Sequence, residues 1–440
     1  MKTTPSFILF LIFLFLTTPL YPQLSKVEKK IVNSVDANHQ DAIKLLEEAV
    51  NINSGSMNFE GVYQVGQLFM ARLAALGLQT KWVDGKEWGR AGHLVAEHKG
   101  KGKTLLLIGH LDTVFELSSP FQRFTMVNDS TMSGPGVGDM KGGDVIIIQS
   151  LQALKDAGLL KDMNIIVVMT GDEELSGRPL HLARQDLIEA AKAADVALGF
   201  EDGDGNPATA VVARRSSSGW QLSVTGVPAH SSQVFTSKIG AGAIYEASRI
   251  IYGFYEALSS EENLTFNPGV VLAGTEVVHD KDKDGGTAYG KSNIVAKQAV
   301  VSGDIRAISP DQLRKTQETM KAIVAKSLPQ TRAEITFGEG YPPLAPTDAN
   351  YHLLGIFDKV SFDLGFGSVK AVNPRDAGAA DISFTAGYVD MALDGLGPGS
   401  AGGHTINETA DPRTLAIQAK RAAILMYRLT TERISTGQKK

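Results

Sequence analysis

Two adjacent carboxylates, Glu173 and Glu174, follow a strongly apolar run that ends at Met169. Adjacent side chains that leave a strand end point in different directions, so the two carboxylates can take different roles. One could hold a metal ion while the other moves a proton. The alternative for an acidic pair after a strand is a solvated loop, so the prediction of chemistry depends on partners elsewhere in the chain.

Potential partners follow a second predicted strand and a glycine-rich run. The segment Thr104–Ile108 predicts a buried strand that leads directly to His110 and Asp112. The run Gly134–Gly143 surrounds Asp139 with glycines, which let the backbone approach a site closely and hold one carboxylate in place. Both segments therefore offer metal ligands.

Two later segments add further candidates. A short predicted strand, Val196–Phe200, ends on Glu201 and Asp202. Much later, the glycine-rich run Gly395–Gly403 leads to His404. These segments complete a set of acidic and imidazole side chains at the ends of predicted elements.

The candidate ligands are two imidazoles and three carboxylates: His110, Asp139, Glu174, Glu201 and His404. The chain has no cysteine, so the set suits zinc, cobalt or manganese rather than an iron–sulfur cluster or a closed structural zinc site. Five ligands exceed the needs of one tetrahedral ion. If one carboxylate bridges, they serve two ions and leave positions for a water, an arrangement suited to hydrolysis.

The order of these motifs resembles the co-catalytic dizinc peptidases and deacylases of the M20 family, such as glutamate carboxypeptidase. The resemblance extends over nearly all of the mature chain. It implies an α/β fold: a zinc-exopeptidase-like catalytic domain, with a mixed sheet flanked by helices, and an inserted α+β lid or dimerisation domain. The motifs that carry it are GHLDTV at Gly109–Val114, GPGVGDMKGG at Gly134–Gly143, GDEE at Gly171–Glu174, FED at Phe200–Asp202 and GGH at Gly402–His404.

The resemblance also implies a role for each ligand. Two Zn²⁺ ions are expected, with Co²⁺ or Mn²⁺ as possible substitutes. Asp139 would bridge them, with Glu174 and His404 on one ion and His110 and Glu201 on the other.

Three further acidic residues are expected beside the metals. The resemblance implies that Glu173 is the general base, which takes a proton from the attacking water and passes it to the leaving nitrogen. Asp112 would accept the free ring N–H of His110 and fix its tautomer, although capping of a loop is the alternative. Asp202 competes with Glu201 as a ligand, and Glu201 is preferred because it directly follows the strand.

The chain is expected to begin with a signal peptide over residues 1–23. Lys2 precedes an apolar run, Phe7–Leu16, which is too short to span a bilayer comfortably. This pattern predicts a secreted or periplasmic protein, and an uncleaved anchor is the alternative. The absence of cysteine neither supports nor contradicts export.

The mature chain is expected to form a catalytic domain interrupted by a lid. From about Ser216 the pattern changes to the alternation of a half-buried strand, and it continues as a small α+β module with a strand predicted at Ile294–Val301. A solvated hairpin loop is expected at Asp280–Gly286. The predicted boundaries are 24–215 for the first catalytic segment, 216–340 for the lid or dimerisation domain and 341–440 for the second catalytic segment.

Three lid residues match positions that act on the substrate in the family. His230, in the run GVPAHS, is implied to reach the partner subunit's active site in a homodimer and to stabilise the oxyanion. Asn293 and Arg306 match substrate-contacting positions, and a guanidinium suits a carboxylate bidentately. The alternatives are a capped surface histidine and ordinary polar residues at strand edges.

The chain departs from glutamate carboxypeptidases near the end of the last lid strand. Those enzymes carry an arginine there for the substrate's terminal carboxylate, whereas this chain reads FGEGY over Phe337–Tyr341. Arg375, in a loop expected near the site, is a hypothetical replacement.

Composition is consistent with a soluble enzyme of two or three domains. The chain has 440 residues, 43% hydrophobic residues and a net charge of −5. Basic residues are scattered, so nucleic-acid binding is not expected, nor is a membrane contact beyond the signal segment. The resemblance implies a carboxypeptidase or dipeptidase that acts on a small peptide and releases a C-terminal amino acid. The alternatives are an N-acyl amino-acid deacylase and a non-catalytic binding protein of the same fold.

Overall fold

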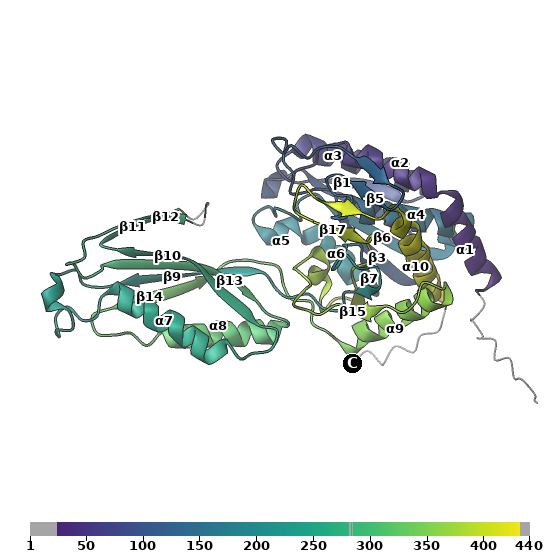
Figure 1. Ribbon diagram of the computed structural model, residues 1–440. Helices are drawn as coiled ribbons and strands as arrows, with labels where there is room; N and C mark the ends of the chain where they lie inside the picture. Colours follow the sequence, from purple (N-terminus) through teal and green to yellow (C-terminus); the bar gives the residue numbers. More distant parts are fainter. Residues whose placement is uncertain (1–23, 281–282, 284, 432–440) are drawn as a thin grey trace, which may run out of the picture.

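The computed structural model describes residues 24–280, 283 and 285–431. Figure 1 shows two lobes: a larger lobe of sheet and helices, and an elongated smaller lobe. The smaller lobe is built from residues 218–337, and the larger lobe from the chain on both sides of it. The leader run Phe7–Leu16 lies outside the described residues. Within the described ranges, no helix has the length and apolar character needed to cross a membrane.

A six-stranded mixed sheet forms the centre of the larger lobe. Strands β6, β3, β7 and β16 run parallel to one another, and β2 pairs antiparallel with both β6 and the edge strand β1. This mixed sheet, flanked by helices, confirms the predicted fold class. The strand order is β1 (Gln79–Asp84), β2 (Gly92–His98), β6 (Met163–Thr170), β3 (Lys101–His110), β7 (Val196–Gly199) and β16 (Met391–Leu393).

The second half of β3 is apolar on both faces, as expected where helices cover both sides of a sheet. Leu105 and Leu107 pack into the core shared with α4 and α10, whereas Leu106 and Ile108 pack against α6 on the other side. The helices of the first side are α1 (Lys26–Ala37), α2 (His39–Val50), α3 (Phe59–Leu76), α4 (Lys141–Asp156), α9 (Asp348–Asp363) and α10 (Pro412–Thr431). The second side carries α6 (Gln185–Ala193), preceded by α5 (Leu180–Ala183), and the 3-10 turn η4 (Asp381–Thr385).

A small four-stranded sheet positions the segment that carries His404. It joins β4 (Thr125–Asn128) and β5 (Thr131–Ser133) to β17 (Ser400–Ala401) and β18 (Thr409–Ala410). His404 lies in the loop between β17 and β18, with a left-handed backbone (φ 61°). Pairing of β18 with β5 therefore fixes where this loop sits.

The smaller lobe is an antiparallel sheet with two helices on one face (Figure 1). On β9 (Ser218–Thr225), Trp220, Leu222 and Val224 alternate into the core formed with α7 (Ala243–Leu258) and α8 (Pro310–Val324). The strand order is β10 (Thr265–Gly274), β13 (Gln298–Arg306), β9 and β14 (Arg332–Phe337).

Two predictions in this lobe need comment. The strand expected from Ile294 begins only at Gln298, because the chain turns first, with the Ile294 amide donating to the Lys291 carbonyl at 3.0 Å. Asn293 therefore lies in a turn, and the predicted start of the strand at Ile294 was wrong. The expected hairpin is formed by β11 (Glu276–Asp280) and β12 (Gly285–Tyr289), while residues 281, 282 and 284 lie outside the described residues.

Candidate metal centre

The predicted ligands converge where the parallel strands of the large sheet end. His110 is the last residue of β3, the Glu173–Glu174 pair follows β6, and Glu201 follows β7. Carboxyl ends of neighbouring parallel strands meet at one edge of a sheet, which is the usual position of sites in α/β folds. The strand order therefore brings together residues that are far apart in the sequence.

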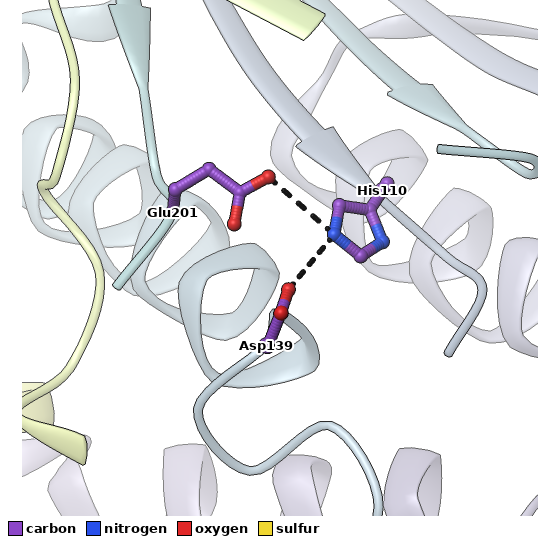
Figure 2. A group of neighbouring side chains, drawn as sticks. All are labelled: His110, Asp139 and Glu201. Atoms are coloured by element: carbon purple, nitrogen blue, oxygen red, sulfur yellow. Dashed lines mark hydrogen bonds and ion pairs between the residues drawn. The ribbon is translucent and has the colours of Figure 1, made fainter. Parts of the chain in front are cut away.

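Glycine lets Asp139 approach this edge. Asp139 lies just before α4, and a side chain at Gly143 in the first turn of that helix would place its Cβ 2.0 Å from the Phe200 carbonyl oxygen. Only glycine permits this contact between α4 and the end of β7. The close approach puts Asp139 beside Glu201 (Figure 2).

Asp139 presents its two oxygens to two separate groups of side chains. Oδ1 lies 3.1 Å from His110 Nε2, and the same nitrogen lies 3.5 Å from Glu201 Oε1 (Figure 2). Oδ2 lies 2.9 Å from His404 Nε2, which in turn is 3.2 Å from Glu174 Oε2. Each group offers three ligand atoms within 4.8 Å of one another, and Asp139 belongs to both. The geometry matches the donor set of a bridged pair of divalent cations.

The electrostatics of the cluster also fit cations. Burial raises the pKa of Glu201 to about 8, and the nearby charge of Asp139 adds to that rise. Burial likewise raises the pKa of Glu174. Hydrogen bonds to Asp139 and Glu174 raise the pKa of His404 to about 11. Buried carboxylates of like charge favour their ionised form only when positive charge is supplied, which bound metal ions would do.

Asp112 contacts both the candidate ligand His110 and the acidic turn, which is the turn that carries Glu173 and Glu174. It is fully buried, and Oδ1 lies 3.3 Å from His110 Nδ1. The same carboxylate accepts the backbone amides of Glu173 and Glu174 at 3.0 and 3.1 Å, and the Ser56 hydroxyl at 2.6 Å. His110 Nδ1 is nearer to the Asp112 backbone carbonyl, at 3.1 Å, and the Asp112 carboxylate caps the loop that carries Glu173 and Glu174.

Glu173 stands apart from the ligand groups. Its carboxylate forms no hydrogen bond or ion pair with any other described residue, whereas its backbone is bonded on both sides. Burial raises the pKa of Glu173 well above its usual value, and the nearby carboxylates of Glu201, Asp381 and Glu174 add to the rise. A free carboxylate with a raised pKa beside the ligands is what a general base needs.

Asp202 and Glu201 point to different partners. Glu201 faces His110, whereas Asp202 Oδ2 accepts a hydrogen bond from the Ser400 hydroxyl at 2.5 Å. The backbone amide of Glu201 donates to Asp394 Oδ1 at 3.4 Å. Of the two competing carboxylates, Glu201 is therefore the one that lies in a ligand group.

Sequence reasoning missed Glu408, which organises the loop that carries Asp139. Glu408 is only 1% exposed, and its carboxylate accepts the backbone amides of Gly136, Gly138 and Asp139 at 3.2, 2.9 and 3.2 Å. Its position four residues after His404 was the only available signal, and an acidic residue at that spacing is not informative by itself.

The predicted residues of the smaller lobe do not join the metal ligands within one chain. His230 is exposed, and its Nδ1 pairs with the hydroxyl of neighbouring Ser232 at 2.9 Å. Asn293 is exposed nearby, and its carbonyl accepts the Ser231 amide at 2.8 Å. Among the described residues, neither side chain contacts a member of either ligand group.

Arg306 and Arg375 instead gather around a third arginine that was not predicted. Arg215 donates from Nη2 to the Arg375 carbonyl at 3.3 Å and from Nη1 to Thr265 Oγ1 at 2.9 Å. Burial lowers the pKa of Arg215, and the positive charges of Arg306 and Arg375 lower it further. The charges of Arg306 and Arg375 therefore act on Arg215 where the two lobes join, and Arg306 itself pairs with Asp304 Oδ2 at 3.1 Å.

Residues 106–428 match the sequence pattern of peptidase family M20/M25/M40. The chain belongs to this family. The match includes all five residues of the two ligand groups, and family membership makes the protein a metal-dependent hydrolase of peptide bonds.

Individual members of the family resemble this chain over most of its length. Carboxypeptidase G2 of Pseudomonas sp. (strain RS-16) is 27% identical over 391 residues, which cover 86% of this chain and 88% of that protein. Aminopeptidase PepT of Bacillus cereus has a TM-score of 0.69 at 18% identity, covering 89% of this chain and 99% of the other. The YXEP protein of Bacillus subtilis, a dinuclear metal-binding M20 peptidase, has a TM-score of 0.63 at 16% identity, covering 90% and 99%. At these identities the two structures show a shared fold.

Proposed function

We propose that this M20 peptidase is a carboxypeptidase or dipeptidase that releases the C-terminal amino acid of a small peptide. The observation that carries the proposal is that Asp139 divides its two oxygens between two histidine–carboxylate groups, with Glu173 on the adjoining turn. Two bound Zn²⁺ ions would supply a water of lowered pKa and polarise the scissile carbonyl. The protein ligands would be His110 and Glu201 for one ion, Glu174 and His404 for the other, and Asp139 for both.

Glu173 would move the proton. Its unpaired, half-buried carboxylate has a raised pKa, which matches a base that takes a proton from water and returns it to the leaving nitrogen. Asp112 would hold His110 and the Glu173 amide in place. A non-catalytic binding protein would not need an unpaired base beside two ligand groups.

The use of two metals is supported by the shared fold with the dinuclear YXEP peptidase and is directly testable. After removal of metal with a chelator, addition of Zn²⁺ should restore activity with two equivalents bound per chain, as measured by elemental analysis. Co²⁺ and Mn²⁺ serve as alternative metals in the same titration. Full activity with one equivalent would contradict a bridged pair.

The cluster of Arg215, Arg306 and Arg375 is the proposed site for the substrate's terminal carboxylate. Guanidinium groups bind carboxylates through paired hydrogen bonds. The three arginines carry three positive charges, and the nearby carboxylates of Asp304 and Asp376 offset only two of them. This position would compensate for the absence of an arginine in the FGEGY segment.

Substitution of the arginines tests this assignment. Arg375→Ala and Arg306→Ala should each raise KM for a peptide substrate about tenfold or more, because a charge-assisted hydrogen bond is lost. Lys370→Ala, at an exposed basic residue of the same lobe as Arg375, is the matched control. Unchanged kinetics in both arginine variants would rule out the cluster as a carboxylate site.

Peptidase activity is favoured over deacylase activity by the similarity to carboxypeptidase G2 along 86% of this chain. The arginine cluster does not discriminate, because N-acyl amino acids also end in a carboxylate. The test is a screen of zinc-supplemented enzyme against C-terminal dipeptides and N-acyl amino acids, read as free amino acid released. Exclusive release from N-acyl amino acids would replace the proposal with the deacylase.

The smaller lobe, within the predicted lid at residues 216–340, is the proposed homodimer interface. Helix α7 exposes Tyr245, Tyr252 and Tyr255, each more than half exposed, and β10 is an edge strand of the lobe's sheet. Exposed aromatic side chains beside an open strand edge favour association with a second copy. Sedimentation of the wild type and of Tyr252→Glu/Tyr255→Glu should show a dimer and a monomer, respectively.

Export remains a proposal that depends on residues 1–23. The apolar run Phe7–Leu16 supports a secreted or periplasmic location. N-terminal sequencing of the protein recovered outside the cytoplasm should show cleavage close to residue 23. Recovery only in the cytoplasm with Met1 intact would contradict it.

A further inference from the structure

The peptide backbone of Glu173 is held from two directions. Its amide donates to Asp112 Oδ1 at 3.0 Å, and its carbonyl accepts the Tyr341 hydroxyl at 3.1 Å. Asp112 follows β3 in the larger lobe, whereas Tyr341 follows β14 of the smaller lobe. One residue therefore has its backbone fixed by groups from two different parts of the fold.

Tyr341 lies on the segment that leads from the smaller lobe back to the larger one, here called the return connector (residues 338–344). Its backbone pairs with Ser217, with N···O distances of 2.9 and 3.1 Å, so it runs alongside the chain that leads into the smaller lobe. Leu344 pairs in the same way with Arg214, at 2.9 Å in both directions. The position of Tyr341 is therefore tied to the junction of the two lobes.

The hydroxyl of Tyr341 has its full set of hydrogen bonds. Arg184 Nη2 donates to it at 2.6 Å, and the Glu173 carbonyl can only accept from it. Because a hydroxyl has one proton, the third neighbour, Ser176 Oγ at 3.0 Å, must be a donor. Tyr341 therefore donates its single hydroxyl proton to the Glu173 carbonyl and accepts from Arg184 and Ser176.

A buried arginine holds this hydroxyl in place. Arg184 is fully buried and pairs with Asp172 Oδ1 and Asp381 Oδ1, both at 2.7 Å. Asp172 immediately precedes Glu173, and its second oxygen accepts the Gly177 amide at 2.8 Å. Arg184 thus joins the acidic turn, the 3-10 turn η4 and the return connector in one fully paired network.

We propose that Tyr341 is a positioning residue for the general base, setting the place of Glu173 through its backbone carbonyl. The inference rests on the role of Glu173 under the proposed function. Among the described residues, Tyr341 contacts no member of the two ligand groups, so its hydroxyl reaches the reacting groups through the Glu173 carbonyl. Since the hydroxyl is carried by the return connector, the position of the base depends on the junction between the lobes.

The test is Tyr341→Phe in the zinc-loaded enzyme. The substituted ring can keep its edge contact with Phe384, at 5.0 Å between centroids, while the hydroxyl's bonds to Glu173, Arg184 and Ser176 are lost. We expect kcat to fall about tenfold, with KM unchanged and two zinc ions still bound. Tyr351→Phe, at an exposed tyrosine of α9, is the matched control and should behave as wild type.

The double variant distinguishes positioning from a general structural defect. In the Glu173→Ala background, Tyr341→Phe should have no further effect on the residual rate, because its target is gone. Additive losses, or a fall in metal content, would overturn the inference. If Glu173→Ala is inactive but Tyr341→Phe has wild-type kcat, only this inference fails. If Glu173→Ala keeps full turnover, the proposed function fails.

Discussion

The carboxylate of Glu408 accepts a hydrogen bond from the backbone amide of Asp139 at 3.2 Å. The same oxygen accepts the Gly138 amide at 2.9 Å, and the other oxygen accepts the Gly136 amide at 3.2 Å. Glu408 lies in the segment that carries His404, so one buried side chain joins the loop of the bridging carboxylate to the loop of a histidine ligand.

Glu408→Gln should weaken zinc binding without removing any ligand. The substituted amide places an NH₂ group against a backbone N–H, so one acceptor is lost in a buried site. Loss of an interaction that orients a ligand weakens metal affinity about 10–100-fold, which a chelator competition titration would measure. Glu334→Gln, at an exposed glutamate of β14, is the control. Wild-type affinity in Glu408→Gln would show that the loop holds its shape without this carboxylate.

Glu173→Ala should retain both metals and lose turnover. General-base catalysis accounts for roughly 10²–10⁴ in rate, so kcat should fall by at least that range while elemental analysis still finds two ions. Asp139→Ala provides the contrast, since loss of the shared carboxylate should strip metal. Loss of metal from Glu173→Ala would mean that the roles of Glu173 and Glu174 had been exchanged.

His230 should act on the active site of the partner subunit. It is exposed and does not contact the ligand groups of its own chain, as expected of a residue that acts in trans. Mixing inactive His230→Ala with inactive Glu173→Ala subunits should therefore restore part of the activity, because a mixed dimer contains one complete site. The assay needs verified subunit exchange, and absence of recovery after exchange would contradict action in trans.

Glu28 should make stability depend on pH. Burial raises its pKa, but hydrogen bonds from the Ser25 amide and from Arg428 outweigh this effect and lower it. Because the folded-state pKa lies below the unfolded value of about 4.3, its stabilisation is complete above that pH and is lost as pH falls through the folded pKa. Glu28→Gln should cost about 1 kcal/mol at pH 7 and less at pH 3.5.

Urea unfolding at the two pH values measures this difference. Glu47→Gln, at an exposed glutamate of the neighbouring helix α2, should change stability little at either pH. An equal loss at both pH values in Glu28→Gln would show that the ionised carboxylate is not the stabilising species.

The sequence by itself placed the candidate ligands at the ends of predicted elements, and the order of its motifs carried the resemblance that implies hydrolysis. Thr104–Ile108 had to be a strand buried on both faces because it is apolar at every position but its first, and His110 follows it directly. Glycines around Asp139 indicated a close backbone approach, which Gly143 confirms. Such features are local, so strand ends and turns could be located without knowing which strands are neighbours.

Only the tertiary structure decided how these ends meet and what holds them. The order β6, β3, β7 brings Glu174, His110 and Glu201 to one edge, and pairing of β18 with β5 delivers His404. Glu408 and Tyr341 gave no usable signal, because a carboxylate or hydroxyl that bonds a distant backbone leaves no periodicity in its own segment. The resemblance to the M20 family implied a base and a ligand in the acidic pair Glu173–Glu174, whereas the position of this pair depends on contacts made across the fold.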